Sequence, residues 1–149
     1  MNVILKTIAV DDQKYQQFLE LRDEVLRRPI GMSIYSDDLS NDKNEVIFIA
    51  LSDDEVIGCL MLKPLASGVG KLRQMAVSSD SQGKGIGQKL MMTAEDFAKN
   101  NGFRLLELNA RITAVPFYEK LGYLVEGSEF TEVGIPHLFM KKDLDEATV

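Results

Sequence analysis

Residues 75–87 read Met75-Ala76-Val77-Ser78-Ser79-Asp80-Ser81-Gln82-Gly83-Lys84-Gly85-Ile86-Gly87. A predicted strand leads here into a loop with glycines at alternate positions, and the loop opens a predicted helix. Glycine has no Cβ atom, so the backbone of such a loop can approach a bound anion closely. The first N–H groups of the helix have no partner within it and lie at the positive end of the helix dipole. The stretch therefore predicts a cradle for a phosphate or pyrophosphate group, to which Lys84 can add a positive charge.

Two common nucleotide-binding loops do not match this stretch. A Walker A loop requires G-x-x-x-x-G-K-[ST], which does not occur in the chain. A dinucleotide fingerprint requires G-x-G-x-x-G, but the residue three after Gly85 is Gln88. The spacing alone also fits a glycine-rich turn that only eases the packing of the strand against the helix.

Outside the glycine loop, the pattern predicts strands interspersed with helices. Strand formers at residues 45–51 and 56–62 flank a polar turn, which is typical of a β-hairpin. Both runs are apolar on both faces, which indicates a sheet that is covered on two sides. The other predicted strands are residues 3–10, 71–77, 103–109, 123–126 and 137–143, and the predicted helices begin after Asp11 or Asp12 and at residues 85 and 114, with a further short helix allowed in the polar segment 31–44.

Composition limits the class of protein. The 149 residues are 45% hydrophobic and 27% charged, which is typical of one globular domain, residues 1–149, and excludes a disordered chain or a coiled coil. No apolar stretch approaches the roughly 20 residues of a membrane span. The formal charge of −6 disfavours nucleic acid as the main partner. Residues 144–149 are expected to be a frayed tail.

Cysteine and histidine usage narrows the chemistry further. One cysteine, Cys59, and one histidine cannot form a Cys/His zinc cluster, so no metal is expected. Cys59 stands among apolar strand residues and is expected in the core. The first ten residues contain no apolar segment typical of a secretory signal, so a cytoplasmic location is expected.

Three segments together resemble the GNAT-type N-acetyltransferase superfamily. Residues 82–87 are similar to the family's Q/R-x-x-G-x-G/A signature, and residues 71–77 to its fourth strand. The segment Phe117-Tyr118-Glu119-Lys120-Leu121-Gly122-Tyr123 resembles its F/L-Y-E-K-L-G-F/Y motif. The resemblance implies a single α/β (α+β) domain whose twisted, mixed, mostly antiparallel sheet has about six to seven strands and about four flanking helices.

A narrower likeness is to a bacterial subset often called ElaA-like. Its matching segments are Leu21-Arg22-Asp23-Glu24-Val25, Asp37-Asp38 and Gly134-Ile135-Pro136-His137. This likeness implies no particular substrate.

The family resemblance implies transfer of the acetyl group from acetyl-CoA directly to a primary amine of a small molecule or protein. The pyrophosphate is expected on the backbone of residues 82–87, and the pantetheine arm on the backbone of Met75 and Val77. The expected cleft lies between residues 75–77 and 106–109, with the N–H of Met75 or Ala76 as the oxyanion donor. Relatives often form homodimers, so a homodimer is a further expectation.

Tyr118 matches the family's tyrosine, which protonates the departing thiolate of coenzyme A. A phenol with a pKa of about 10 stays protonated at neutral pH and can donate. The alternative is that the ring only packs between helix and sheet. The sequence does not identify the general base, because Arg73-Gln74 occupies the strand position where many relatives have glutamate. Glu107, His137 and water are the candidates.

A second departure concerns the asparagine that many relatives carry seven residues before the tyrosine, where it contacts the pantetheine arm. This position is Arg111, and Asn109 is the nearby substitute. Arg111 can instead meet a phosphate of coenzyme A or an acidic acceptor, or be a solvated cation. The acidic run of Asp37, Asp38, Asp42 and Glu45 is either a rim that favours a cationic acceptor or a solvated loop. The missing carboxylate base also leaves open a non-catalytic acyl-CoA sensor or interaction protein.

Overall fold

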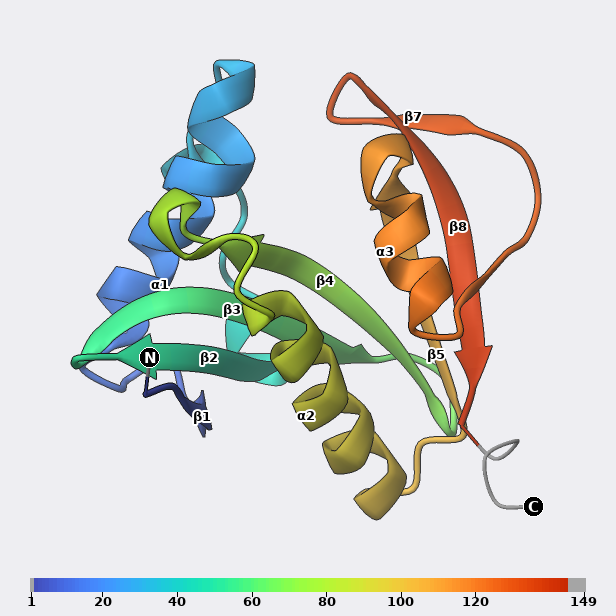
Figure 1. Cartoon of the computed structure of the whole chain (residues 1–149), viewed down its shortest axis with the longest axis horizontal. Coiled ribbons are helices and arrows are strands. Elements are labelled where there is room, and N and C mark those ends of the chain that lie inside the picture. The colour runs from blue at the N-terminus through green and yellow to red at the C-terminus, as the bar shows by residue number, and fades with distance from the viewer. Residues whose placement is uncertain (1, 145–149) are drawn as a thin grey trace.

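In the computed structural model, which describes residues 2–144, the predicted hairpin is the centre of one half of the sheet (Figure 1). Strands β2 (Val46–Ser52) and β3 (Glu55–Pro64) pair antiparallel and are joined through Asp53 and Asp54, which both have positive φ. Alternate side chains of β2 enter two separate apolar clusters, one on each face. The prediction of a sheet covered on two sides is confirmed.

The sheet has eight strands in the order β1-β2-β3-β4-β5-β8-β6, with β7 paired to β8. Among the strands of residues 2–144, only the β4–β5 pair is parallel. The strand count exceeds the predicted six to seven because β7 lies between the predicted strands 123–126 and 137–143. The bounds of the other strands are β1 (Ile4–Ile8), β4 (Val69–Val77), β5 (Leu105–Arg111), β6 (Leu124–Val125), β7 (Phe130–Glu132) and β8 (Ile135–Asp143).

Three α-helices, rather than about four, flank the sheet within residues 2–144. Helix α1 (Tyr15–Arg22) packs on one face, and α2 (Ile86–Asn100) on the other. Helix α3 (Val115–Lys120) lies beside β5 and β8 (Figure 1). The expected short helix in the polar segment is instead two 3-10 turns, Ile34–Ser36 and Asp42–Asn44.

Strands β4 and β5 stay together for only part of their length. Their parallel pairing runs from Val69–Leu105 to Leu72–Leu108 and ends there. Between Arg73 and Ala76, β4 has one residue more than the stretch of β3 that it pairs with, which makes a β-bulge and bends the strand. Figure 1 shows the green β4 and the orange β5 meeting at one end and diverging toward the other.

The end of the chain differs from the prediction at its first residue. Leu144 is buried in the core, and its N–H donates to the carbonyl of Arg104 at 2.8 Å, so it is not part of a frayed tail. Residues 145–149 of that predicted tail lie outside the described residues. Within the described part of the chain, no helix is both long and apolar enough to cross a membrane.

Candidate active site

A cavity of about 950 Å³ opens where β4 and β5 diverge. Ligand sites in proteins are roughly 300–1,000 Å³, so this cleft can hold a substantial small molecule. The glycine loop forms one end, and the segment after α1 and β7 form the other walls. The predicted site residues in its lining are Met75, Ala76, Val77, Gln82, Gly83, Gly85, Ile86, Gly87, Asn109, Arg111, Tyr118 and His137.

Two predicted site residues, Lys84 and Glu107, are not in that lining. Lys84 is exposed. Glu107 lies where β5 is still paired on both sides, between Lys71 of β4 and Lys141 of β8. Of the predicted cleft wall at residues 106–109, Leu108 and Asn109 line the cavity, whereas Leu106 and Glu107 do not. The pairing of β5 with β4 ends at Leu108, so the open edge of β5 begins at Asn109.

The glycine loop is shaped as an open anion cradle. Gly83 and Gly85 both have φ of +78°, a left-handed conformation that favours glycine, and nothing lies within 4 Å of a Cβ built at either position. Gly85 precedes the first turn of α2, which no side chain caps. The side-chain amide of Gln82 donates to the carbonyl of Val77 at 3.0 Å and braces the loop against β4. The first-turn N–H groups therefore face open space at the positive end of the helix.

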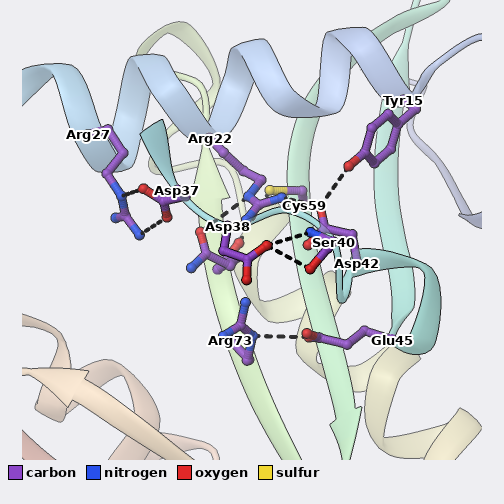
Figure 2. Close-up of polar contacts among 11 residues, drawn as sticks. Tyr15, Arg22, Arg27, Asp37, Asp38, Ser40, Asp42, Glu45, Cys59 and Arg73 are labelled. Carbon is purple, nitrogen blue, oxygen red and sulfur yellow. Dashed lines mark hydrogen bonds and ion pairs between the residues drawn. The ribbon is translucent and has the colours of Figure 1, made fainter. Parts of the chain in front are cut away.

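The bulge in β4 is held by a buried polar network (Figure 2). Gln74 has φ of +60°, an uncommon value for a residue with a side chain. Its side-chain oxygen accepts from Nε of Arg22 at 3.2 Å, and its carbonyl accepts from Sγ of Cys59 at 3.3 Å. Arg22 is 1% exposed and also bonds Asp42 at 2.9 Å, which accepts a further bond from Tyr15 at 2.7 Å. Contacts on both sides of the bulge thus compensate for its strain.

The prediction that Cys59 lies in the core is confirmed. It is fully buried, and burial raises the pKa of its thiol to about 12. A thiol in that state is neutral and unreactive, so Cys59 is not a candidate nucleophile.

Arginines neutralise most of the acidic run that was predicted as a rim or a solvated loop (Figure 2). Asp42 pairs with Arg22, Asp37 with Arg27 through two bonds of 2.9 and 3.2 Å, and Glu45 with Arg73 at 3.0 Å. Asp38 is the member of the run without a cationic partner among residues 2–144. Its pKa is lowered by hydrogen bonds from Ser40. The run therefore presents little net negative charge to the cleft.

Tyr118 stands at the inner wall of the cleft, on α3. Burial raises the pKa of its phenol to about 12. Its ring makes edge contacts with Phe117 and Tyr123, at 5.0 and 6.1 Å between centroids. The hydroxyl has no hydrogen-bond partner among residues 2–144. It is consequently a neutral proton donor that remains available to a molecule in the cleft.

His137 lies near the start of β8, lines the cleft and is buried. Its Nδ1 lies 2.7 Å from the carbonyl of Ile135, which makes Nδ1 the protonated nitrogen of the neutral ring. Its Nε2 lies 3.6 Å from a carboxylate oxygen of Glu132. The other oxygen of Glu132 accepts from Asn109 at 3.2 Å. Three strands, β8, β7 and β5, thus bring an imidazole, a carboxylate and an amide together at one side of the cleft.

The chain as a whole matches a known protein family. Residues 9–144 match the family model described as an acetyltransferase (GNAT) domain. The chain belongs to the GNAT acetyltransferase family. Over 139 residues this GNAT protein is 30% identical to YjcF of Bacillus subtilis, an uncharacterised N-acetyltransferase, with 91% of this chain and 97% of YjcF covered. The predicted family is confirmed.

Solved structures show the same GNAT fold. A protein from Lactobacillus plantarum is 27% identical, with a TM-score of 0.83 and coverage of 96% of this chain and 97% of the other. Escherichia coli ElaA is 17% identical, with a TM-score of 0.83 and coverage of 95% and 100%. The PaiA N-acetyltransferase of Thermoplasma acidophilum, solved with coenzyme A, is 20% identical, with a TM-score of 0.79 and coverage of 96% and 99%. The predicted fold class is confirmed.

Three polar residues that form or support this GNAT cleft were not predicted: Gln74 and Glu132, which line it, and the buried Arg22 behind Gln74. Arg22 and Gln74 act together across 52 positions of sequence, and no local pattern indicates such a pair. Glu132 was missed because its hairpin was missed. The hairpin's turn, Val133-Gly134, has positive φ at both residues, and a glycine beside a short polar strand is the signal that could have indicated it.

Proposed function

We propose that this protein transfers the acetyl group of acetyl-CoA directly to a primary amine of a small molecule or protein. One observation carries the proposal. A single cavity joins the open glycine loop, the unpaired edge of β4 and Tyr118. An anion cradle, a strand edge for an amide chain and a buried proton donor are the three features that acetyl transfer from a thioester requires.

Acetyl-CoA would be held mainly by backbone groups. The N–H groups at residues 82–87 would bind the pyrophosphate. The space beside Gly83 and Gly85 is open, so an anion can approach the backbone there. Beyond Leu72, the edge of β4 that faces β5 has no strand partner among residues 2–144, so it can bond the amides of the pantetheine arm as an added strand would. The likeness to PaiA, solved with coenzyme A, supports this assignment. Backbone binding also explains how a chain with a formal charge of −6 would bind an anionic substrate.

Two groups of the protein would stabilise the transfer itself. The amine nitrogen forms a bond to the thioester carbon, and the carbon–sulfur bond breaks. The backbone N–H of Met75, in the bulge, would donate to the oxygen on which negative charge develops, because the N–H of Ala76 is already engaged by the buried sulfur of Cys59. The Tyr118 hydroxyl would deliver its proton to the departing sulfur and recover one from solvent.

The amine proton needs an acceptor, and of the two predicted bases we favour His137. It lines the cleft, whereas Glu107 does not. With Nδ1 committed to the carbonyl of Ile135, the neutral ring can take up a proton at Nε2. The carboxylate of Glu132, 3.6 Å away, would stabilise the charged ring that results.

Thiol release tests the proposed function. Incubation with acetyl-CoA and a panel of primary amines is expected to release the free thiol of coenzyme A with at least one amine, in an amount equal to the acetylated amine. Acetyl-CoA is also expected to raise the melting temperature of the protein, whereas ATP is not. Thermal protection by acetyl-CoA without thiol release from any amine would contradict catalysis and favour a binding protein.

A further inference from the structure

Two guanidinium groups in the cleft retain unused donors, although the nearby carboxylates are paired. Arg73 of β4 bonds Glu45 through Nε, and both of its terminal nitrogens are without partners among the described residues. Arg111 of β5 bonds the carbonyl of Leu26 through one terminal nitrogen at 3.4 Å. It has no carboxylate partner within residues 2–144. Guanidinium groups with open N–H pairs match the geometry of a carboxylate.

Both arginines belong to the α1 side of the sheet, away from the glycine loop. On β5, Leu108 and Ala110 enter the apolar cluster beneath α2, so strand alternation directs Arg111 to the opposite face. Its bond to Leu26, which follows α1, agrees with that direction. On β4, Arg73 follows Leu72 of the same cluster and bonds Glu45 on the α1 side. Because α2 starts at the glycine loop, the two arginines line the end of the cavity opposite the expected pyrophosphate.

We propose that the acetyl acceptor carries a carboxylate near its amine, and that Arg111 binds this carboxylate with help from Arg73. The inference rests on the proposed function and names the class of acceptor. An amino acid or an amino-acid-like molecule has this chemistry, with an amine to react and an anion to be held in place.

Neighbouring charges fit a ligand that has both signs. Lys71 adds a cation to the same strand face and has no ion-pair partner among residues 2–144. Asp38 and Glu132 are the carboxylates of the lining not paired with arginine, and both stand on its walls. Asp38 is engaged by Ser40, and Glu132 by Asn109 and His137. The carboxylate of an acceptor therefore meets cations on the strands, while its amine meets polar acceptors around them.

Matched acceptors test the inference. Free amino acids, their amides and the corresponding decarboxylated amines are compared as acceptors by kcat/KM. The kcat/KM of the acid is expected to exceed that of its amide and of its decarboxylated amine by about tenfold or more. With either of these, the Arg111 guanidinium is left without a carboxylate partner, which costs free energy. Arg111→Gln is expected to make the kcat/KM values of the acid, the amide and the decarboxylated amine nearly equal, mainly by raising the KM of the acid. Arg111→Lys is expected to retain part of the preference for the acid, since lysine keeps the positive charge but lacks the paired N–H groups of the guanidinium.

The affinity for acetyl-CoA shows whether Arg111 binds the carboxylate of the acceptor or a phosphate of coenzyme A. Arg111→Gln is expected to leave the Kd of acetyl-CoA unchanged, as is Lys99→Gln, which removes the same charge from the exposed end of α2. A weaker Kd for Arg111→Gln alone would assign Arg111 to a phosphate of coenzyme A and overturn the inference. Amides accepted as well as acids would overturn it too, while leaving the proposed function standing. Thiol release from no amine of either kind would overturn both.

Discussion

Replacing Tyr118 by phenylalanine is expected to lower kcat by about 100-fold or more, with the Kd of acetyl-CoA unchanged. The variant keeps the buried ring and removes only the hydroxyl that would protonate the departing thiolate. The pKa of about 12 means that this hydroxyl is protonated throughout the pH range of an ordinary assay. Ionisation of Tyr118 therefore should not limit the activity of the wild-type protein at moderately alkaline pH. Steady-state kinetics and calorimetric titration of acetyl-CoA provide the two measurements.

Tyr123→Phe is the matched control for this experiment. Tyr123 is a second buried tyrosine near α3, but its hydroxyl bonds Glu95 at 2.8 Å and it is not in the cleft lining. Its loss should cost stability, about 1–3 kcal/mol from the hydrogen bond to a charged group, and leave kcat near that of the wild type. A similar kcat for Tyr118→Phe and wild type would refute the role of Tyr118 as general acid. Equal losses of kcat in both tyrosine variants would indicate a structural role instead.

Arg22→Met is expected to lower the free energy of unfolding by about 3–5 kcal/mol. Asp42 is 2% exposed and would lose its cationic partner, and Gln74 would lose the side-chain bond that holds its positive φ. The bulge should then relax toward regular strand geometry, so the folded fraction should also show a lower kcat. Denaturant unfolding gives the stability, and kinetics below the melting temperature give the second effect.

A surface ion pair supplies the control for Arg22. Lys141 and Glu126 are 2.6 Å apart, with side chains 41% and 57% exposed. Lys141→Met removes a cation in the same way and is expected to cost less than about 1 kcal/mol, because exposed pairs contribute little. A loss for Arg22→Met no larger than that for Lys141→Met would contradict the role of the buried network. A large loss of stability with an unchanged kcat would show that the network supports the fold and not the bulge.

Local pattern was enough to predict much of the fold. The glycine loop, the hairpin at residues 45–62 and helix α2 follow from glycine placement and apolar periodicity, which are properties of short segments. The family followed from three motifs in their order. The bulge at Gln74 was not predictable in this way, because it depends on a mismatch in length between two strands and on Arg22, far away in the sequence.

The part of the candidate site that the sequence predicts best is the glycine loop, whose backbone groups face the cleft. Residues 82–87, apart from Lys84, line the cleft, because a loop between a strand and a helix has few possible shapes. Charged side chains were harder to place, because their position depends on partners from other elements. The acidic run was expected to face an acceptor or the solvent, but Arg22, Arg27 and Arg73 neutralise most of it. Glu107 has the right residue type and strand face but lies too early on β5, where pairing with β4 continues.

The fate of the acetyl group in a single turnover tests direct acetyl transfer most directly. Acetyl-CoA labelled with a heavy carbon isotope in its acetyl group is mixed with excess protein and a primary amine, and amine and protein are analysed by mass spectrometry. Direct transfer predicts that the label appears in the amine as free coenzyme A forms, with none attached to the protein. Label that stays in protein-bound acetyl-CoA with every amine tested would contradict catalysis, and label attached to the protein before the amine would contradict direct transfer.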